Sequence, residues 1–270
     1  MNDGMMAPLY FGIPLRARST TNDWGLVCTN LQRTLESVLG QTDAEVAVII
    51  AGHDKPEFLT TYDPRVTFID ISDTAPPPEG VDQFNEDKKH KKIRIGHALR
   101  QTINRPVYYM HMDADDLVHT RFAHRVLKDK NKSGYLIHRG YVVDVANGEI
   151  AKADEKTTPF YKHCGSCAVV HFAPDELPHK PTGGTSPFSQ YLHHGKYVET
   201  AAAQGKILQP MSSYAGAYLV NHGENNRRYK GLDSKKVDFV SRNRITDPDL
   251  IKDICGGFHG LAEIMENKAS

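Results

Sequence analysis

The sequence predicts an α/β fold in which a mostly parallel central sheet is flanked by helices and followed by a smaller, mixed half. Two observations lead to this prediction. Short apolar runs alternate with segments of helical periodicity up to residue 116, which is typical of strands joined by crossover helices. Beyond residue 126 the pattern changes to short strands, turns and loops. No repeat or low-complexity linker divides the chain, so we expect one domain over residues 1–270, with halves at about 7–126 and 127–270.

The elements of the first half follow from apolar spacing and from the residues that interrupt it. Continuous apolar runs predict buried strands, and apolar residues that recur every three or four positions predict helices. Asn22 or Asp23 can cap the first helix, and Gly40 ends it. The predicted order is strand 9–14, a helix up to residue 39, strand 45–51, strand 66–71, helix 86–103 and strand 106–112.

The second half is predicted to contain shorter elements. Asn147-Gly148, between two apolar segments, is a hairpin turn signal. A segment rich in proline and glycine over 173–187 indicates a long loop. The remaining predictions are strands over 135–145, 149–151, 167–172 and within 207–220, a helix over 188–204, a polar loop over 221–228, and a helix over 247–266 interrupted at Gly256-Gly257.

Composition excludes several classes of function. Lys and Arg total 33, as do Asp and Glu, so no basic field favours nucleic acid and we expect no such partner. No stretch approaches the ~18 apolar residues of a transmembrane helix, and peripheral membrane contact stays open. Residues 1–8 lack the basic and apolar segments of a signal peptide. We therefore expect a cytoplasmic protein whose four cysteines are reduced thiols.

The most informative segment is 106–116, PVYYMHMDADD, a buried strand that ends in carboxylates. In open α/β sheets, ligands bind at the carboxyl ends of strands. Carboxylates this close repel one another unless a cation lies between them, which predicts Mn²⁺ or Mg²⁺. Such a metal usually keeps positions for water and substrate phosphates. The alternative is a solvated acidic loop in which Asp116 caps a helix beginning near residues 119–121.

Two further motifs have more than one interpretation. Cys164-Gly165-Ser166-Cys167 is a single Cys-x-x-Cys, which by itself suits a zinc or redox site less well than a pair of buried thiols. The run 88–94, KKHKKIR, is the densest basic segment. It forms either a solvated helix face or a surface from which one or two lysines reach a phosphate.

The order of these elements resembles the nucleotide-sugar-dependent glycosyltransferases of the Rossmann-like GT-A fold, especially the family 2 type. The resemblance covers about residues 9–126, and Asp113-Ala114-Asp115-Asp116 is its strongest single match to that family's Asp-x-Asp motif. The segment 31–42, LQRTLESVLGQT, is similar to the first helix of the family, which typically ends in a leucine-x-glutamine signature. The resemblance implies metal-dependent transfer of a sugar from a nucleotide diphosphate sugar, with UDP-sugars favoured, to a carbohydrate or other hydroxyl acceptor.

The resemblance also implies roles for individual residues. Pro14 and Arg16 would lie beside the base and ribose, and Asp54 would accept a hydrogen bond from the base. Lys92 or a neighbour would approach the nucleotide. The implied ligands of Mn²⁺ or Mg²⁺ are Asp113, which could instead contact the ribose, Asp115, and His222 as the third protein ligand.

The chain departs from the family pattern in ways that leave alternatives open. The family usually places an acidic pair before a helix as the catalytic base, whereas the corresponding region offers only Asp175-Glu176 in a proline-rich loop. The base, the anomeric outcome, the sugar, the acceptor and the oligomeric state are therefore not predicted. His111, Asp113 and Asp115 share one strand face, which would also suit a metal-dependent phosphohydrolase. A non-catalytic protein that binds nucleotide sugars is a further alternative.

Overall fold

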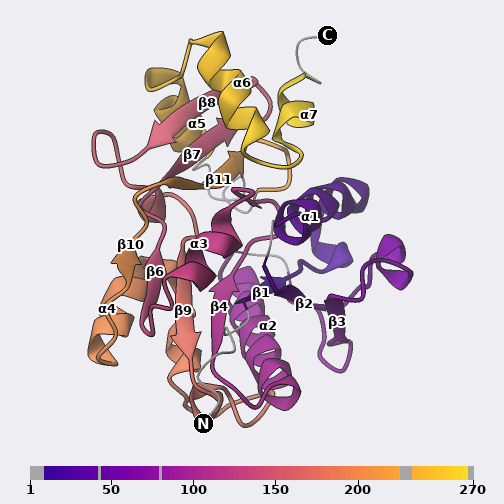
Figure 1. The fold of residues 1–270 in the computed structure, drawn as a ribbon. Coiled ribbons are helices and arrows are strands. Elements are labelled where there is room, and N and C mark those ends of the chain that lie inside the picture. The colour runs from indigo at the N-terminus through magenta and orange to yellow at the C-terminus, as the bar shows by residue number, and fades with distance from the viewer. Residues whose placement is uncertain (1–8, 42–43, 79–80, 226–232, 267–270) are drawn as a thin grey trace.

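The computed structural model describes residues 9–41, 44–78, 81–225 and 233–266, and these fold around two β-sheets (Figure 1). The larger sheet contains, in spatial order, β10 (Gln209–Pro210), β6 (Gly134–Leu136), β9 (Ala168–Phe172), β4 (Val107–His111), β1 (Leu9–Pro14), β2 (Val46–Gly52) and β3 (Val66–Asp70). Its strands run parallel except β9, which is antiparallel to both neighbours. The prediction of an α/β fold with a mostly parallel sheet is confirmed.

The smaller sheet is mixed and has its own apolar core. Its strands, in spatial order, are β5 (Leu117–Val118), β11 (Tyr214–Val220), β7 (Arg139–Asp144) and β8 (Glu149–Ala153). The predicted hairpin joins β7 to β8, and Gly148 takes a φ of 63° in its turn, a conformation that favours glycine. Figure 1 shows this sheet beside the yellow C-terminal helices, which contribute Ile254 and Leu261 to its core, and Phe258 of the turn between these helices is also part of it.

Helices cover both faces of the larger sheet. The helices of the described residues are α1 (Trp24–Leu39), α2 (Val81–Thr102), α3 (Phe122–Lys128), α4 (Tyr197–Ala203), α5 (Asp233–Arg242), α6 (Pro248–Gly256) and α7 (Leu261–Glu266). Phe11 of β1 packs against Phe122 of α3 on one face. On the other face Tyr109 of β4 contacts Phe188, which also meets Gly96 of α2. None of these helices is long and apolar enough to cross a membrane.

The chain reverses its direction across the larger sheet beside β1. From β1 the chain passes through α1 to β2 and then β3, moving to one side, and α2 then carries it back across to β4 on the other side of β1 (Figure 1). The strand order therefore reverses between β1 and β4. In open α/β sheets the carboxyl ends of strands at such a reversal form the usual ligand site.

Local signals predicted several boundaries closely. Strand β1 matches its predicted range, and Asp23 caps α1 by accepting a hydrogen bond from the backbone N–H of Leu26 at 3.0 Å. Gly40 ends that helix, as predicted. Helix α2 begins at Val81, five residues before the predicted 86. Residues 1–8, in which no signal peptide was recognised, and 226–228 of the predicted polar loop lie outside the described residues.

Two predictions of secondary structure and one alternative interpretation were wrong. The expected strand 135–145 is divided between β6 and β7, which belong to different sheets. The expected helix over 188–204 contains only α4, which two short 3₁₀ turns precede. Phe188 in the first turn and Tyr191 just after it are both buried. Asp116 does not cap α3, whose N-cap is Arg121 without a side-chain hydrogen bond. Helix α5 was not predicted.

Candidate functional site

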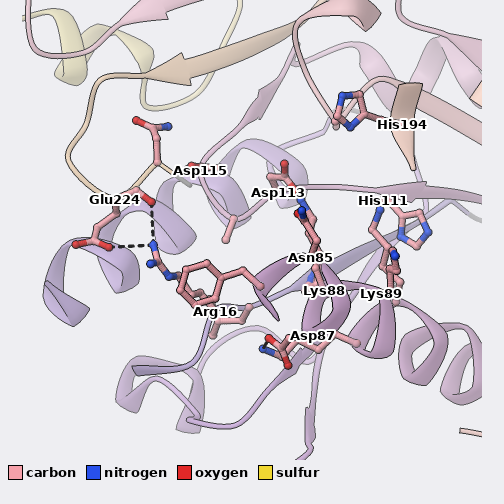
Figure 2. A pocket seen from close by; sticks show the side chains of 18 of the residues that line it. Arg16, Asn85, Asp87, Lys88, Lys89, His111, Asp113, Asp115, His194 and Glu224 are labelled. Carbon is pink, nitrogen blue, oxygen red and sulfur yellow. Dashed lines mark hydrogen bonds and ion pairs between the residues drawn. The ribbon is translucent and has the colours of Figure 1, made fainter. Parts of the chain in front are cut away.

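A pocket of about 430 Å³ opens at the carboxyl ends of β1 and β4. This volume lies in the range of small-molecule sites. Of the residues that the sequence predicts for donor and metal binding, six line this pocket: Pro14, Arg16, Lys92, Asp113, Asp115 and His222. Figure 2 shows Asn85, Asp87, Lys88 and Lys89 along α2 below Asp113, with His194 on the opposite side. Residues from both halves of the chain therefore meet at the carboxyl ends of the strands, where the sequence predicts a ligand site.

Asp113 forms an ion pair with Lys88 of α2 at the centre of the pocket. Burial alone would raise the pKa of the Asp113 carboxyl, but the ammonium outweighs burial and lowers this pKa. Burial alone would likewise lower the pKa of Lys88, and the carboxylate outweighs it and raises that pKa. Both groups stay charged at neutral pH, and each side chain keeps 30% of its surface exposed. A ligand can therefore reach both charges.

Asp115 lies against His222, which is 107 residues away in the sequence. The distance from Nε2 of His222 to Oδ2 of Asp115 is 2.8 Å, and Nδ1 of the same ring lies 3.2 Å from Nδ2 of Asn30. His222 follows Asn221, whose φ of 59° turns the chain back after β11. The resemblance implied that Asp115 and His222 act together, and the structure brings them into contact.

A carboxylate and an imidazole in contact are donor types that a divalent cation can use, and Nε2 of His222 also lies 2.7 Å from Nδ2 of Asn225. A carboxylate and an imidazole suit Mn²⁺ better than Mg²⁺, and metals of this kind often bind through one or two side chains plus substrate phosphates. Within the described part of the chain, no group of three or more His, Cys, Asp or Glu side chains is arranged to hold an ion. Asp113 is instead turned to Lys88, so Asp115 and His222 are the residues that would hold the metal.

Arg16 and Glu224 join the end of β1 to the segment after β11. Nη1 of Arg16 donates to the backbone carbonyl and to Oε2 of Glu224, both at 3.3 Å, as the dashed lines in Figure 2 show. The other carboxylate oxygen of Glu224 accepts the backbone N–H groups of Asn22 and Asp23 at 3.0 and 2.8 Å. The guanidinium of Arg16 also lies 4.9 Å from the ring centroid of Phe84 on α2. These contacts hold the end of β1, the start of α1 and the segment after β11 together beside the pocket.

Lys92 is a buried lysine in the pocket wall. Its side chain is 4% exposed, and Nζ donates to the carbonyl of Leu192 at 3.2 Å and to the hydroxyl of Tyr197 at 3.4 Å. Burial, helped by the nearby charge of Lys88, lowers the pKa of Lys92 to about 7. Its neighbour Lys91 is also buried but is paired with Asp87 of the same helix.

Replacing Lys92 by methionine is expected to remove a pH dependence of stability. Between a folded pKa of about 7 and an unfolded value of about 10.4, the unfolded chain binds more protons than the folded protein. The free energy of unfolding should therefore rise with pH across this interval, by up to about 1.4 kcal/mol per pH unit. Urea unfolding at several pH values should show this slope in the wild-type protein and lose it in Lys92→Met. An equal slope in both proteins would contradict the assignment.

The Cys-x-x-Cys segment forms hydrogen bonds with the turn that carries the carboxylates after β4. Oδ2 of Asp116 accepts hydrogen bonds from Oγ of Ser166 at 2.6 Å and from Sγ of Cys164 at 3.1 Å. The backbone N–H of Asp113 in turn donates to Oγ of Ser166 at 2.8 Å. Burial, followed by the charges of Asp115 and Asp113, raises the pKa of Asp116 well above its usual value. The segment therefore positions the turn that carries Asp113 and Asp115.

The two cysteines of this segment are free, buried thiols. Burial raises the pKa of both Cys164 and Cys167, so the thiolate that metal binding or redox chemistry requires is disfavoured. Of the alternatives for the motif, buried thiols agree best with this environment.

Ser166→Ala is expected to destabilise the protein and weaken ligand binding together. The change removes the donor to buried Asp116 and the acceptor for the Asp113 N–H, which should lower the free energy of unfolding by about 1–3 kcal/mol. Denaturant unfolding measures this loss, and Ser241→Ala, on the exposed face of α5, is the control. If the two variants were equally stable, Ser166 would not hold the turn.

Three predicted residues lie away from the pocket. Oδ2 of Asp54 accepts the backbone N–H of Arg18 at 2.8 Å, and Asp54 is not among the described residues that line the pocket. Asp175 and Glu176 follow β9, whose last residue pairs with the first residue of β4. They therefore lie at the opposite end of the strands from Asp113. Glu176 also forms an ion pair with Lys206 at 2.6 Å. This placement does not support Asp175 or Glu176 as the catalytic base.

Lys88, Ser166 and Glu224 contribute to the site but were not singled out from the sequence. Lys88 was one of several lysines in the basic run, and the spacing of that run does not show which of them faces a carboxylate. Glu224 lies in the polar segment after His222, whose concentration of polar groups was the only local signal. The partners of all three residues are more than 20 positions away.

No protein-family model matches the chain, and no curated protein is similar enough to be counted as a relative. The position of the pocket in the sheet and the charges of its lining are therefore the basis for a functional proposal.

Proposed function

We propose that the protein is a metal-dependent glycosyltransferase of GT-A-like architecture, acting on a nucleotide diphosphate sugar and a hydroxyl acceptor. The observation that carries this proposal is the convergence of opposite charges at one pocket. Asp115 and His222 are in contact on one side of the pocket and would hold a cation, and the lysines of α2 line the other side and would receive an anion. A diphosphate bridged by a metal is the kind of ligand that needs both.

The pocket residues have distinct roles in this proposal. Lys88 and Lys89 would receive the negative charge of the diphosphate. Asp115 and His222 would hold Mn²⁺ or Mg²⁺, which would supply Lewis-acid stabilisation of the leaving diphosphate. Asp113 would contact the ribose or metal-bound water and, through Lys88, would fix the position of the diphosphate. On the β4 side the pocket is lined by His111, which is buried.

The nucleoside would occupy the end of the pocket next to β1. Pro14 ends that strand, and Arg16 presents a guanidinium that Glu224 and Phe84 already hold in place. An ordered planar cation of this kind is a suitable partner for a base or a ribose hydroxyl. We favour UDP because the resemblance favours it.

Nucleotide release from a panel of sugar donors tests this proposal. The protein would be incubated with UDP-glucose, UDP-galactose, UDP-N-acetylglucosamine and GDP-mannose, with Mn²⁺ or with EDTA, and the released nucleoside diphosphate would be measured. We expect Mn²⁺-dependent release from one donor class. Release of inorganic phosphate from nucleoside monophosphates or p-nitrophenyl phosphate, with no release from any donor, would instead favour the phosphohydrolase.

His222→Ala is expected to weaken Mn²⁺ binding by about 10–100-fold while the fold stays intact. The change removes the only imidazole in contact with Asp115 among the described residues. The Mn²⁺ affinity in the presence of UDP can be followed by electron paramagnetic resonance. His179→Ala removes an exposed imidazole outside the pocket and should behave as wild type. An unaltered Mn²⁺ titration in His222→Ala would remove this residue from the metal site.

A further inference from the structure

Three residues of α2 line the pocket at successive positions along the helix axis. Phe84, Lys88 and Lys92 are spaced four residues apart and all line the pocket, so they lie along one face of the helix. At a rise of ~1.5 Å per residue, Lys88 lies about 6 Å and Lys92 about 12 Å along the axis from Phe84. If the nucleoside lies at Phe84 and Arg16 and the diphosphate at Lys88, then Lys92 faces the group attached beyond the diphosphate.

Most cations of the pocket have a carboxylate partner. Arg16 is paired with Glu224, Lys89 with Glu86, and Lys91 with Asp87. Lys88 takes the carboxylate of Asp113.

Lys92 differs, because among the described residues no carboxylate lies within ion-pair distance of its Nζ. Its two hydrogen-bond acceptors, the Leu192 carbonyl and the Tyr197 hydroxyl, are neutral. The carboxylate of Asp113, which acts on Lys92 only at longer range, is already paired with Lys88, so the charge of Lys92 has no ion-pair partner among the described residues. An ammonium has three N–H donors, so one donor of Lys92 is left for a ligand.

A buried lysine without a counterion is costly for the fold. Desolvation disfavours its charged form, and an apolar side chain of similar length would fill the same space without that cost. Natural proteins keep such destabilising groups chiefly where function uses them. The environment of Lys92 therefore suggests that its missing partner is a negatively charged group of the ligand.

We propose that the end of the pocket formed by Lys92, His111, Leu192 and His193 binds a carboxylate or phosphate group carried by a sugar. We call these four residues the Lys92 subsite. The inference rests on the proposed function for the position of the diphosphate, and it adds that the substrate is an acidic or phosphorylated sugar. The charged group belongs either to the sugar of the donor or to the acceptor.

Calorimetric titrations at pH 6.5 in the presence of Mn²⁺ test the donor as the source of the anion. The wild-type protein, Lys92→Met and Lys128→Met would each receive UDP, UDP-glucose and UDP-glucuronate. We expect the wild type to prefer UDP-glucuronate over UDP-glucose by about tenfold or more, and Lys92→Met to lose this preference while its affinity for UDP changes by less than about threefold. Lys128→Met, which loses an exposed lysine of α3 outside the pocket, should match the wild type.

The acceptor is tested by titrating glucuronate and glucose 6-phosphate into the UDP-saturated protein. Binding that is about tenfold weaker in Lys92→Met would assign the anionic group to the acceptor. The same two compounds are also titrated without nucleotide. If neither UDP nor GDP binds in the presence of Mn²⁺, the proposed glycosyltransferase is wrong, yet Lys92-dependent binding of these anions would still support the subsite.

The proposal is overturned by one pattern of results. No preference for UDP-glucuronate, together with anion binding that is absent or equally strong in Lys92→Met, would show that Lys92 receives no anionic group. Thermal unfolding separates this outcome from misfolding, because Lys92→Met should be at least as stable as the wild type once the buried charge is removed.

Discussion

Asp115→Asn is expected to abolish metal-dependent nucleotide binding and to leave the fold unchanged. The substitution keeps the shape of the side chain but removes the charge that lies 2.8 Å from His222. A neutral amide is a much weaker ligand for Mn²⁺ or Mg²⁺ than a carboxylate. Titration of UDP in the presence of Mn²⁺ should show a loss of at least about 100-fold in affinity, with a melting temperature within a few degrees of the wild type.

Asp129→Asn is the matched control for this change. Asp129 is exposed just after α3 and does not line the pocket, so its variant makes the same change in net charge without touching the site. If Asp115→Asn bound UDP and Mn²⁺ as tightly as Asp129→Asn does, Asp115 would not hold the metal.

Glu224→Ala is expected to damage both stability and nucleotide binding. The Glu224 carboxylate is buried, with 3% of its surface exposed, and it accepts from Arg16 and from two backbone N–H groups at the start of α1. Removing it leaves those N–H groups without their acceptor and takes the counterion away from a largely buried guanidinium, which should cost about 3–5 kcal/mol of unfolding free energy. Glu224→Gln keeps one acceptor oxygen and should lose less.

The pair Arg244 and Glu149 provides a control of the same chemistry. Its N–O distance is 3.1 Å, but the arginine side chain is 57% exposed, so Glu149→Ala should cost less than about 1 kcal/mol. Urea unfolding measures both variants. A loss for Glu224→Ala no larger than that for Glu149→Ala would show that the contact between β1, α1 and the segment after β11 is unimportant.

The parts of the fold that could be predicted from sequence are those fixed by local chemistry. Strand β1 is a continuous apolar run that ends in proline, and α1 carries its own cap in Asp23 and its own stop in Gly40. The turn at Asn147-Gly148 is equally local. In each case the residues that determine the structure lie within a few positions of it.

The elements that were predicted wrongly depend on distant partners. The predicted strand from Tyr135 to Val145 contains the polar interruption His138-Arg139-Gly140, which was not taken as a boundary. β6 pairs with β9 and β7 pairs with β11, so the segment is split between the two sheets. Phe188 and Tyr191 have apolar spacing compatible with a helix, but both turn into the core beside Phe172. Helix α5 is mostly polar, with Val237, Phe239 and Val240 as its apolar residues, and it was not recognised in the sequence.

In the candidate site, too, features set by neighbouring residues were predicted, and contacts between distant residues were not. The carboxylates after β4 were recognised because a buried strand that ends in Asp113 and Asp115 is unusual on its own. The contact between Asp115 and His222 was implied only by a resemblance, and the ion pair of Lys88 with Asp113 was not anticipated. Ion pairs between residues far apart in sequence depend on which helix face meets which strand, and spacing does not reveal this.

Calorimetric titration of UDP into the wild-type protein, with Mn²⁺ and then with EDTA, tests the proposed glycosyltransferase site most directly. We predict micromolar binding that requires the metal, because the diphosphate would join the cation at Asp115 and His222 to the lysines of α2. Absence of UDP and GDP binding in the presence of Mn²⁺, or UDP binding of equal strength in EDTA, would contradict it.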